Sequence, residues 1–237
     1  MTTSKTVLIV GAKEGIGLEL AKKFHERGYR VYGTVRSLEK DKDHLGPLSA
    51  VATQILEIDL ADENTIQSAA QKFGEDKPLD LLINSAALGP GPLDWGDYSA
   101  DILVEWFRVN TVGPFLTTKH FYPALERSPR GKIINLSSNM ASMSSLSDNP
   151  QGRHIGYRIS KAALNQLTVS LGREFKSHES KVTANAIHPG WIPTTMTGFI
   201  GPDDMEVQTA AIVETIEKLE PGDTGKFLNA WGEDFPW

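Results

Sequence analysis

A tyrosine and a lysine four residues apart form a pair in this sequence that could do acid–base chemistry. The run Tyr157-Arg158-Ile159-Ser160-Lys161 puts a phenol and an ammonium group on one face of a helix, if the chain is helical to about Ser177. A free phenol has a pKa of about 10, so a tyrosine that transfers protons near neutral pH needs an adjacent cation to lower that pKa. Lys161 is that cation. Such pairs also occur by chance in helices that face solvent, so the surrounding sequence has to decide.

Two serines stand at the end of an apolar run that precedes this pair. Residues Ile133 to Leu136 read as a buried strand, and Ser137 and Ser138 follow at its carboxyl end. Ligands of open parallel sheets bind at that edge. Side chains alternate along a strand, so the two hydroxyls are expected to point to opposite faces.

A glycine-rich turn near the start of the chain is suited to binding phosphate. Gly11, Gly15 and Gly17 follow the apolar run Lys5 to Val10 and precede a helical pattern. Glycine permits a tight strand-to-helix turn and lets a pyrophosphate approach bare backbone near the positive end of a helix. The spacing GxxxGxG differs from the common dinucleotide fingerprint GxGxxG, and a tight turn without a ligand is the alternative interpretation.

The end of the second apolar run indicates which dinucleotide binds. An acidic residue there would hydrogen-bond the ribose 2′-hydroxyl of NAD, but the segment reads Gly33-Thr34-Val35-Arg36-Ser37. The guanidinium fork of Arg36 suits a bidentate contact to a 2′-phosphate, so we expect NADP(H) rather than NAD(H). Lys13 adds a second positive charge, which the neighbouring Glu14 opposes. An arginine solvated at a strand end is the alternative.

Short apolar runs alternate with longer amphipathic stretches, the pattern of a parallel sheet with helices on both faces. Apolar residues recur at helical spacing from Ile16 to Phe24 and again from Ala162 to Leu171. The segment Asn139 to Gly156, rich in Ser and Met, is expected to be a long loop beside a site. Seven strands are predicted: Lys5 to Val10, Arg30 to Val35, Gln54 to Ile58, Leu79 to Asn84, Lys132 to Ser137, Val182 to His188 and Lys226 to Ala230.

Length and composition exclude several classes of protein. A chain of 237 residues without a linker-like stretch predicts one domain over residues 1–237. There is no cysteine and the six histidines show no metal-binding pairing, so we expect neither disulfides nor a metal site. A formal net charge of −6 disfavours nucleic acid as a partner. No run approaches the roughly 20 apolar residues of a membrane span and the start does not resemble a signal peptide, which indicates a cytoplasmic protein without a membrane partner.

Together these motifs resemble the short-chain dehydrogenase/reductase family, and the resemblance covers nearly the whole chain. The stretch YRISKAALNQ and the ending GKFLNAWGEDFPW are most similar to the carbonyl-reductase-like branch that includes the sniffer and C-factor proteins. The resemblance implies an α/β protein with a three-layer, doubly wound Rossmann fold. It rests on seven motifs in order: the glycine turn, Asp59 in EIDL, Asn84-Ser85-Ala86-Ala87, Asn110 in VNTVGP, the serines of INLSS, the Tyr157 and Lys161 pair, and HPGWIPT.

The resemblance also implies a role for each matching residue. Tyr157 gives a proton to a carbonyl oxygen while the nicotinamide delivers hydride to carbon, and Ser138 is a second donor to that oxygen. Lys161 lowers the pKa of Tyr157 and holds the nicotinamide ribose, while Asn110 holds a water in a proton relay to Lys161. The cofactor contacts expected besides Tyr157 and Lys161 are Gly11, Lys13, Gly15, Ile16, Gly17, Arg36, Asp59, Leu60, Asn84, Ala86, Pro189, Gly190, Ile192 and Thr194.

Some of these residues have plainer interpretations. Asp59 fits a turn residue, Asn110 a buried amide and Thr194 a helix cap. Ser138 is preferred as the catalytic serine because it ends the predicted strand; Ser137 and Ser144 are the alternatives. We expect His188, before the Pro189-Gly190 turn, to be structural, since Tyr157 already fills the acid–base role.

The expected function is NADP(H)-dependent reduction of a ketone, aldehyde or quinone, with a small carbonyl or alcohol compound as partner. The alternatives are an NADP(H)-binding sensor without turnover and an NAD-linked alcohol dehydrogenase. Family members often form homodimers or homotetramers through the helices that carry Asn110 and Tyr157. The loops Asn139 to Gly156 and Thr195 to Gln208 are expected to set the substrate. Five large apolar residues are expected either to line an apolar pocket or to lie in the core: Trp95, Met140, Met143, Trp191 and Phe199.

Overall fold

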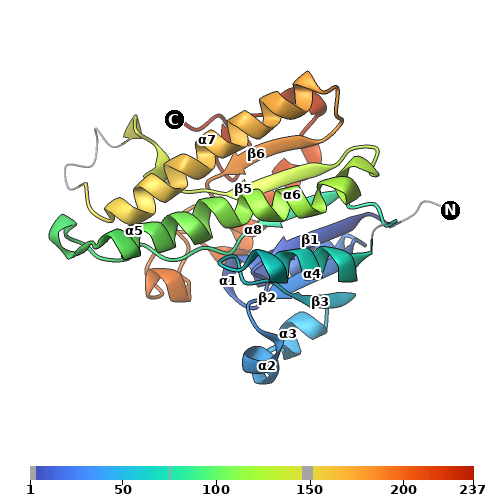
Figure 1. The fold of residues 1–237 in the computed structure, drawn as a ribbon, viewed down its shortest axis with the longest axis horizontal. Coiled ribbons are helices and arrows are strands. Elements are labelled where there is room, and N and C mark those ends of the chain that lie inside the picture. Colours follow the sequence, from blue (N-terminus) through green and yellow to red (C-terminus); the bar gives the residue numbers. More distant parts are fainter. Residues whose placement is uncertain (1–3, 75, 146–151) are drawn as a thin grey trace.

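A seven-stranded parallel sheet lies between two layers of helices in the computed structural model, which describes residues 4–74, 76–145 and 152–237 (Figure 1). The strand order is β3-β2-β1-β4-β5-β6-β7. This confirms the doubly wound Rossmann-type fold expected from the sequence. The strands are β1 (Thr6–Val10), β2 (Arg30–Val35), β3 (Gln54–Glu57), β4 (Leu81–Asn84), β5 (Lys132–Leu136), β6 (Thr183–Ile187) and β7 (Phe227–Leu228).

Every predicted strand is present, with ends that differ by at most two residues from those expected. β7 is the most shortened, because backbone groups on both sides of it have other partners. The Lys226 N–H donates to the side chain of Asn185 at 3.0 Å, and the Asn229 N–H donates to the Glu233 carbonyl at 2.9 Å. These two N–H groups are therefore not available for further hydrogen bonds between β7 and β6.

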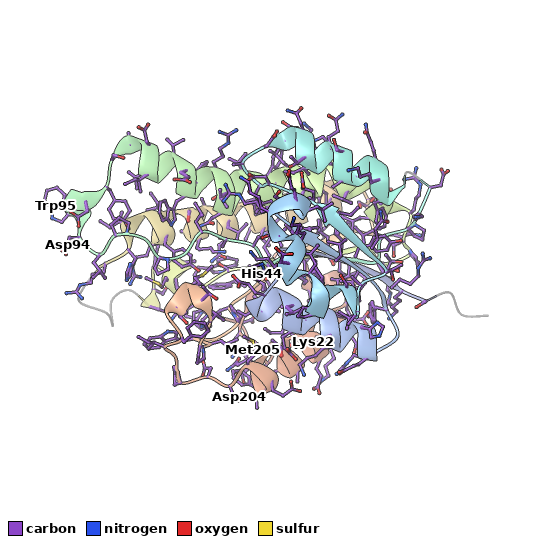
Figure 2. All side chains as sticks on the ribbon, turned by 90° about the horizontal axis from the view of Figure 1, so that it is seen from below. Lys22, His44, Asp94, Trp95, Asp204 and Met205 are labelled. Carbon is purple, nitrogen blue, oxygen red and sulfur yellow. The ribbon has the colours of Figure 1, made fainter. Side chains whose placement is uncertain are left out.

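Helices cover both faces of the sheet. On one face α1 (Gly15–Glu26) and α8 (Met205–Lys218) pack side by side, and Lys22 and Met205 mark them in Figure 2. On the other face lie α4 (Glu63–Phe73), α6 (Gly113–Glu126) and α7 (Ile155–Ser177). The shorter elements are α2 (Leu38–Asp41), α3 (Gly46–Ser49), α5 (Ala100–Phe107), a π turn (Arg108–Val112) and 3-10 turns at Lys42–His44, Trp95–Asp97, Asn139–Ala141, Thr195–Thr197 and Pro221–Asp223.

A hydrophobic core lies on each face of the sheet, because the side chains of a strand alternate between the two faces. Val7 and Ile9 of β1 pack in the cluster that contains Phe24 of α1, while Leu8 and Val10 pack in the cluster that contains Phe121 of α6. All four β1 side chains are at most 1% exposed. This explains why the strands read as near-continuous apolar runs.

The predicted long loop from Asn139 to Gly156 is described in part. It begins with the 3-10 turn Asn139–Ala141. Its last two predicted residues, Ile155 and Gly156, belong to α7. Residues 146–151 lie outside the described part of the chain. On either side of these residues, Ser138 follows β5 and Tyr157 lies in the first turn of α7.

Candidate active site

A cleft of about 390 Å³ opens over the carboxyl ends of β1 to β4. The sheet order changes direction between β1 and β4, and open α/β sheets bind ligands at such a point. The segment after β6 also lines the cleft, as do Glu105 of α5 and Val109 of the π turn that follows α5. The expected cofactor residues that line this cleft are Gly11, Lys13, Gly15, Ile16, Gly17, Arg36, Asp59, Leu60, Ala86 and Thr194.

The glycine turn has room only for glycine at two positions. A Cβ on Gly17 would lie 2.0 Å from the Gly11 carbonyl oxygen, and a Cβ on Gly11, whose φ is +82°, would lie 2.6 Å from the Cβ of Ala86. The Gly11 N–H donates to the hydroxyl of Thr34 at 3.0 Å, which ties the turn to β2. Gly15 has a φ of +58° and faces Thr194 at ordinary contact distance. The backbone therefore borders the cleft without side chains in between, a cradle that fits a pyrophosphate.

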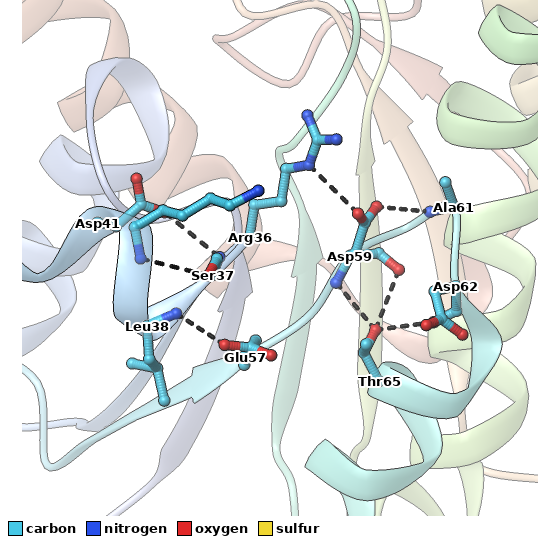
Figure 3. Close-up of polar contacts among 10 residues, drawn as sticks. Arg36, Ser37, Leu38, Asp41, Glu57, Asp59, Ala61, Asp62 and Thr65 are labelled. Carbon is cyan, nitrogen blue, oxygen red and sulfur yellow. Dashed lines mark hydrogen bonds and ion pairs between the residues drawn. The ribbon is translucent and has the colours of Figure 1, made fainter.

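Arg36 and Asp59 form an ion pair at one end of the cleft (Figure 3). The Arg36 Nε donates to Asp59 Oδ2 at 3.2 Å, while Asp59 Oδ1 accepts the Ala61 N–H at 2.9 Å. Thr65 donates its hydroxyl to the Asp59 carbonyl and accepts the Asp59 N–H. Asp59 is therefore a turn residue and a cleft residue at once. The Arg36 side chain is 80% exposed, so its two Nη groups remain available to an anion.

The reactive side chains expected from the sequence come together beside this cleft. Tyr157 lies in the first turn of α7 and hydrogen-bonds the hydroxyl of Ser138, which follows β5. Lys161, one turn further along, lies with its Nζ 5.8 Å from the centre of the Tyr157 ring. That ammonium donates to the Leu136 carbonyl at 2.7 Å, so it reaches the carboxyl end of β5. Tyr157, Ser138 and Lys161 are all less than 9% exposed.

Burial changes the acid–base properties of this pair. The pKa of Tyr157 is raised by burial to about 12, although its hydrogen bond with Ser138 lowers it. Burial also lowers the pKa of Lys161 from 10.5 to about 7. Lys161 was expected to depress the pKa of Tyr157; the net shift of Tyr157 is upward, and the role of Lys161 stays a prediction. The physical reason is that desolvation disfavours the charged form of both groups.

The buried lysine makes stability depend on pH. Between about pH 7 and 10.5 the unfolded chain holds a proton on Lys161 that the folded chain does not hold, so the free energy of unfolding rises with pH by up to about 1.4 kcal/mol per pH unit. Lys161→Met removes the group that binds this proton, so we expect the free energy of unfolding to rise less steeply with pH. Denaturant unfolding between about pH 7.5 and 9.5 measures it. Lys176→Met, at an exposed lysine of the same helix, should keep the native slope; equal slopes for Lys161→Met and the native protein would contradict the assignment.

Asn110 joins the cleft wall to α7. It is fully buried in the π turn between α5 and α6. Its Oδ1 accepts the Leu88 N–H at 2.8 Å, and its Nδ2 donates to the Ser160 hydroxyl at 3.0 Å. The side chain is therefore a buried, hydrogen-bonded amide, which was the alternative interpretation of Asn110. It links Leu88 in the wall of the cleft to Ser160, the residue before Lys161.

The backbone of Asn110 carries a signal that sequence reasoning missed. Pro114 stands four residues later and has no N–H, so the Asn110 carbonyl lacks its α-helical donor. The chain widens to a π turn at this point, and such turns frequently lie at functional sites.

Six expected cofactor residues are not among those that line the cleft: Asn84, Tyr157, Lys161, Pro189, Gly190 and Ile192. Asn84 instead donates to Asn135 at 2.8 Å and accepts from Thr117 at 2.7 Å in a buried polar chain. A Cβ on Gly190 would meet Asp203 and Gln208, so this turn packs against the segment before α8 and against the first turn of α8. The Pro189-Gly190 turn contributes indirectly, because it directs the chain to Thr194.

The two alternative serines lie in other surroundings. The Ser137 hydroxyl is buried and donates to Asn165 Oδ1 at 2.6 Å. Ser144 is exposed, and its N–H donates to the Trp237 carbonyl at 2.8 Å. His188 is packed against Phe235, and burial lowers its pKa to about 4, in keeping with a structural histidine.

The apolar residues proposed for a pocket wall are neither core nor lining of this cleft. Trp95 is 80% exposed and lies at the outer edge of the molecule in Figure 2. Met143, Trp191 and Phe199 are also more than half exposed, and Met140 is half-buried. Met196, which sequence reasoning did not select, lines the cleft instead. It has no motif of its own and follows Thr194 by two residues.

Within residues 4–74, 76–145 and 152–237, no group of three or more His, Asp or Glu side chains is arranged to hold a metal ion. In the same part of the chain no helix has the length and apolar character needed to cross a membrane.

Most of the chain is similar to known proteins. A family model described as short chain dehydrogenase matches residues 5–204. The C-signal protein of Myxococcus xanthus is 30% identical over 164 residues, 68% of this chain and 93% of that protein. The NADPH-bound carbonyl reductase from chicken fatty liver has a TM-score of 0.88 at 27% identity, with 99% of both chains covered. The carbonyl reductase Sniffer of D. melanogaster has a TM-score of 0.86 at 29% identity, with 99% of this chain and 100% of that chain covered.

Proposed function

The chain belongs to the short-chain dehydrogenase family and is an oxidoreductase, and we propose that it is an NADP(H)-dependent carbonyl reductase. The observation that carries the proposal is the buried cluster of Tyr157, Ser138 and Lys161 beside a cleft whose glycine turn fits a pyrophosphate. Two similar solved structures are carbonyl reductases, one of them with NADPH bound. The small-molecule partner is accordingly a carbonyl compound or its alcohol, and the proposed location is the cytoplasm.

Residues around the cleft would hold the cofactor in a defined direction. The glycine turn Gly11 to Gly17 would take the pyrophosphate on its backbone. Arg36 and Lys13 would face the 2′-phosphate, and Asp59 with Leu60 would border the adenine. Thr194, across from Gly15, would border the nicotinamide half.

Arg36 is expected to set the preference for NADPH. Arg36→Ala should weaken NADPH binding by about 10- to 100-fold, because a charge-assisted bidentate contact is lost, and should change NADH binding less than about twofold. Titrations of both nucleotides followed by fluorescence measure this. Lys42→Ala, at an exposed lysine that does not line the cleft, is the control. Equal loss for both nucleotides, or tighter NADH binding by the native protein, would overturn the 2′-phosphate assignment.

The reacting oxygen would lie between two hydroxyl donors. Bound NADPH supplies the hydride to the carbonyl carbon. Charge then builds on the oxygen, and Tyr157 and Ser138 stabilise it by hydrogen bonds before Tyr157 gives up its proton. Lys161 would hold the nicotinamide ribose. Water held at Asn110 would return the proton through Lys161.

The protonation states at neutral pH are compatible with a tyrosine that donates a proton to a carbonyl oxygen. With a pKa of about 12, Tyr157 is protonated at neutral pH and can donate, whereas removing a proton from an alcohol would require its phenolate. Lys161, with a pKa of about 7, exchanges protons near neutral pH. A donor and a proton reservoir are what carbonyl reduction needs.

The test is consumption of NADPH with a panel of ketones, aldehydes and quinones. Turnover with at least one class, faster than alcohol oxidation with NAD, supports the proposal. Tight NADPH binding without turnover over the whole panel would favour the sensor alternative. Faster alcohol turnover with NAD would favour the dehydrogenase alternative.

A homo-oligomer is part of the proposed function. Val104 and Phe107 of α5, Phe115 of α6 and Ile159 of α7 are all more than 40% exposed, although they are large apolar side chains. They lie on the helices that the family resemblance implicated in assembly. Sedimentation at micromolar concentration distinguishes a dimer or tetramer from a monomer.

A further inference from the structure

Asp41 lies where the adenosine end of the cofactor is proposed to bind. It ends α2, and its side chain, 13% exposed, lines the same cleft as Arg36 and Lys13. The Lys13 ammonium donates to Asp41 Oδ1 at 2.9 Å. The Ser37 N–H, directly after Arg36, points to Asp41 Oδ2 at 3.4 Å, as Figure 3 shows.

These two donors are the kind that bind a phosphate. A phosphate ester would accept from a lysine ammonium, an arginine fork and a backbone N–H. Asp41 already presents two anionic oxygens to the lysine and the backbone N–H. The Lys13 ammonium holds the pKa of Asp41 below its ordinary value, so the carboxylate is charged at neutral pH.

Carboxylates outnumber cations at this end of the cleft. Each of its two cations is paired with a carboxylate, Arg36 with Asp59 and Lys13 with Asp41. Glu14 also lines the cleft and raises the pKa of Lys13, as Asp41 does more strongly. A second anion can therefore bind only next to an existing carboxylate or after displacing it.

We propose that Asp41 is an internal competitor of the cofactor 2′-phosphate for Lys13, and that it limits the preference of this protein for NADPH over NADH. The inference rests on the proposed function, because it concerns the same cofactor site. It assigns to Asp41 a specificity-determining role that no sequence motif indicated. NADH has no 2′-phosphate, so its binding does not compete with Asp41.

The direction of the effect follows from charge. A dianionic phosphate near Asp41 meets repulsion, and it must share or take over the Lys13 ammonium. Asp41→Asn removes the negative charge and keeps the size of the side chain and one acceptor oxygen for the Ser37 N–H. Lys13 is then released, and we expect about tenfold tighter NADPH binding and less than about twofold change for NADH.

The experiment titrates the purified protein with NADPH, NADH and adenosine 2′,5′-bisphosphate. The bisphosphate reports the adenosine end without the nicotinamide. Asp43→Asn removes the same charge two residues away, at an exposed position outside the cleft, and should leave all three affinities within about twofold. Circular dichroism of both variants checks that the fold is kept.

A second variant tests whether Asp41 acts through Lys13. In a Lys13→Met background, Asp41→Asn should have a much smaller effect on bisphosphate affinity than it has alone. An Asp41→Asn protein that is folded but binds NADPH no tighter than the native protein, or gains equally for NADH, overturns the inference. Failure of the native protein to bind either nucleotide would instead overturn the proposed function.

Discussion

Tyr157→Phe is expected to lower carbonyl turnover by about 10³-fold or more while NADPH binding changes less than about twofold. The variant keeps the buried ring and loses only the hydroxyl, which hydrogen-bonds Ser138. General acid catalysis contributes about 10²- to 10⁴-fold, and the same hydroxyl also stabilises the developing oxyanion. Steady-state rates with saturating NADPH and the best substrate of the panel measure the loss.

Tyr98→Phe is the matched control for this substitution. Tyr98 donates its hydroxyl to the Pro92 carbonyl at 2.8 Å instead of bonding a side chain of the reactive cluster. Its removal should leave turnover within a few-fold of the native value. A Tyr157→Phe enzyme that retains a tenth or more of native turnover would remove Tyr157 from the role of acid.

Ser138→Ala is expected to lower turnover by about 10²- to 10³-fold, the usual effect of removing one donor to a developing oxyanion. The Ser138 hydroxyl bonds the Tyr157 phenol and accepts the Met140 N–H at 3.1 Å. Its loss removes a donor and also loosens the 3-10 turn that follows β5. The rate of the chemical step, from single-turnover mixing with NADPH, separates catalysis from binding.

The other two serines provide the comparison. Ser144→Ala keeps the backbone bond to Trp237 and should leave turnover within about twofold of native. Ser137→Ala breaks the buried bond to Asn165 and should cost about 1 kcal/mol of unfolding free energy, with little loss of turnover. A larger turnover loss in Ser144→Ala than in Ser138→Ala would reverse the assignment.

Most of the fold could be predicted because its signals are local. Near-continuous apolar runs such as Thr6–Val10 can only be strands buried on both faces, and the glycines at 11, 15 and 17 can only close a tight turn. The ends of β7 could not be predicted, because its length depends on the side chain of Asn185, distant in sequence.

Part of the site required the folded chain. The sequence indicated Tyr157 and Lys161 through helical spacing, and Arg36 through its place after β2. It did not indicate that Asn84 is used in a buried chain with Asn135 and Thr117, since an amide in a motif looks the same whether it faces a ligand or the core. It also gave no sign of Asp41.

The sequence by itself determined residue types and local geometry: which runs are strands, where the glycine turn lies, and that a phenol and an ammonium share a helix face. The tertiary structure alone decided the charge states and the pairings between distant segments. Burial raises the pKa of Tyr157, and Lys13 meets Asp41 only because β1 and β2 are adjacent in the sheet. Desolvation and long-range ion pairs depend on what surrounds a group in space, which spacing along the chain does not contain.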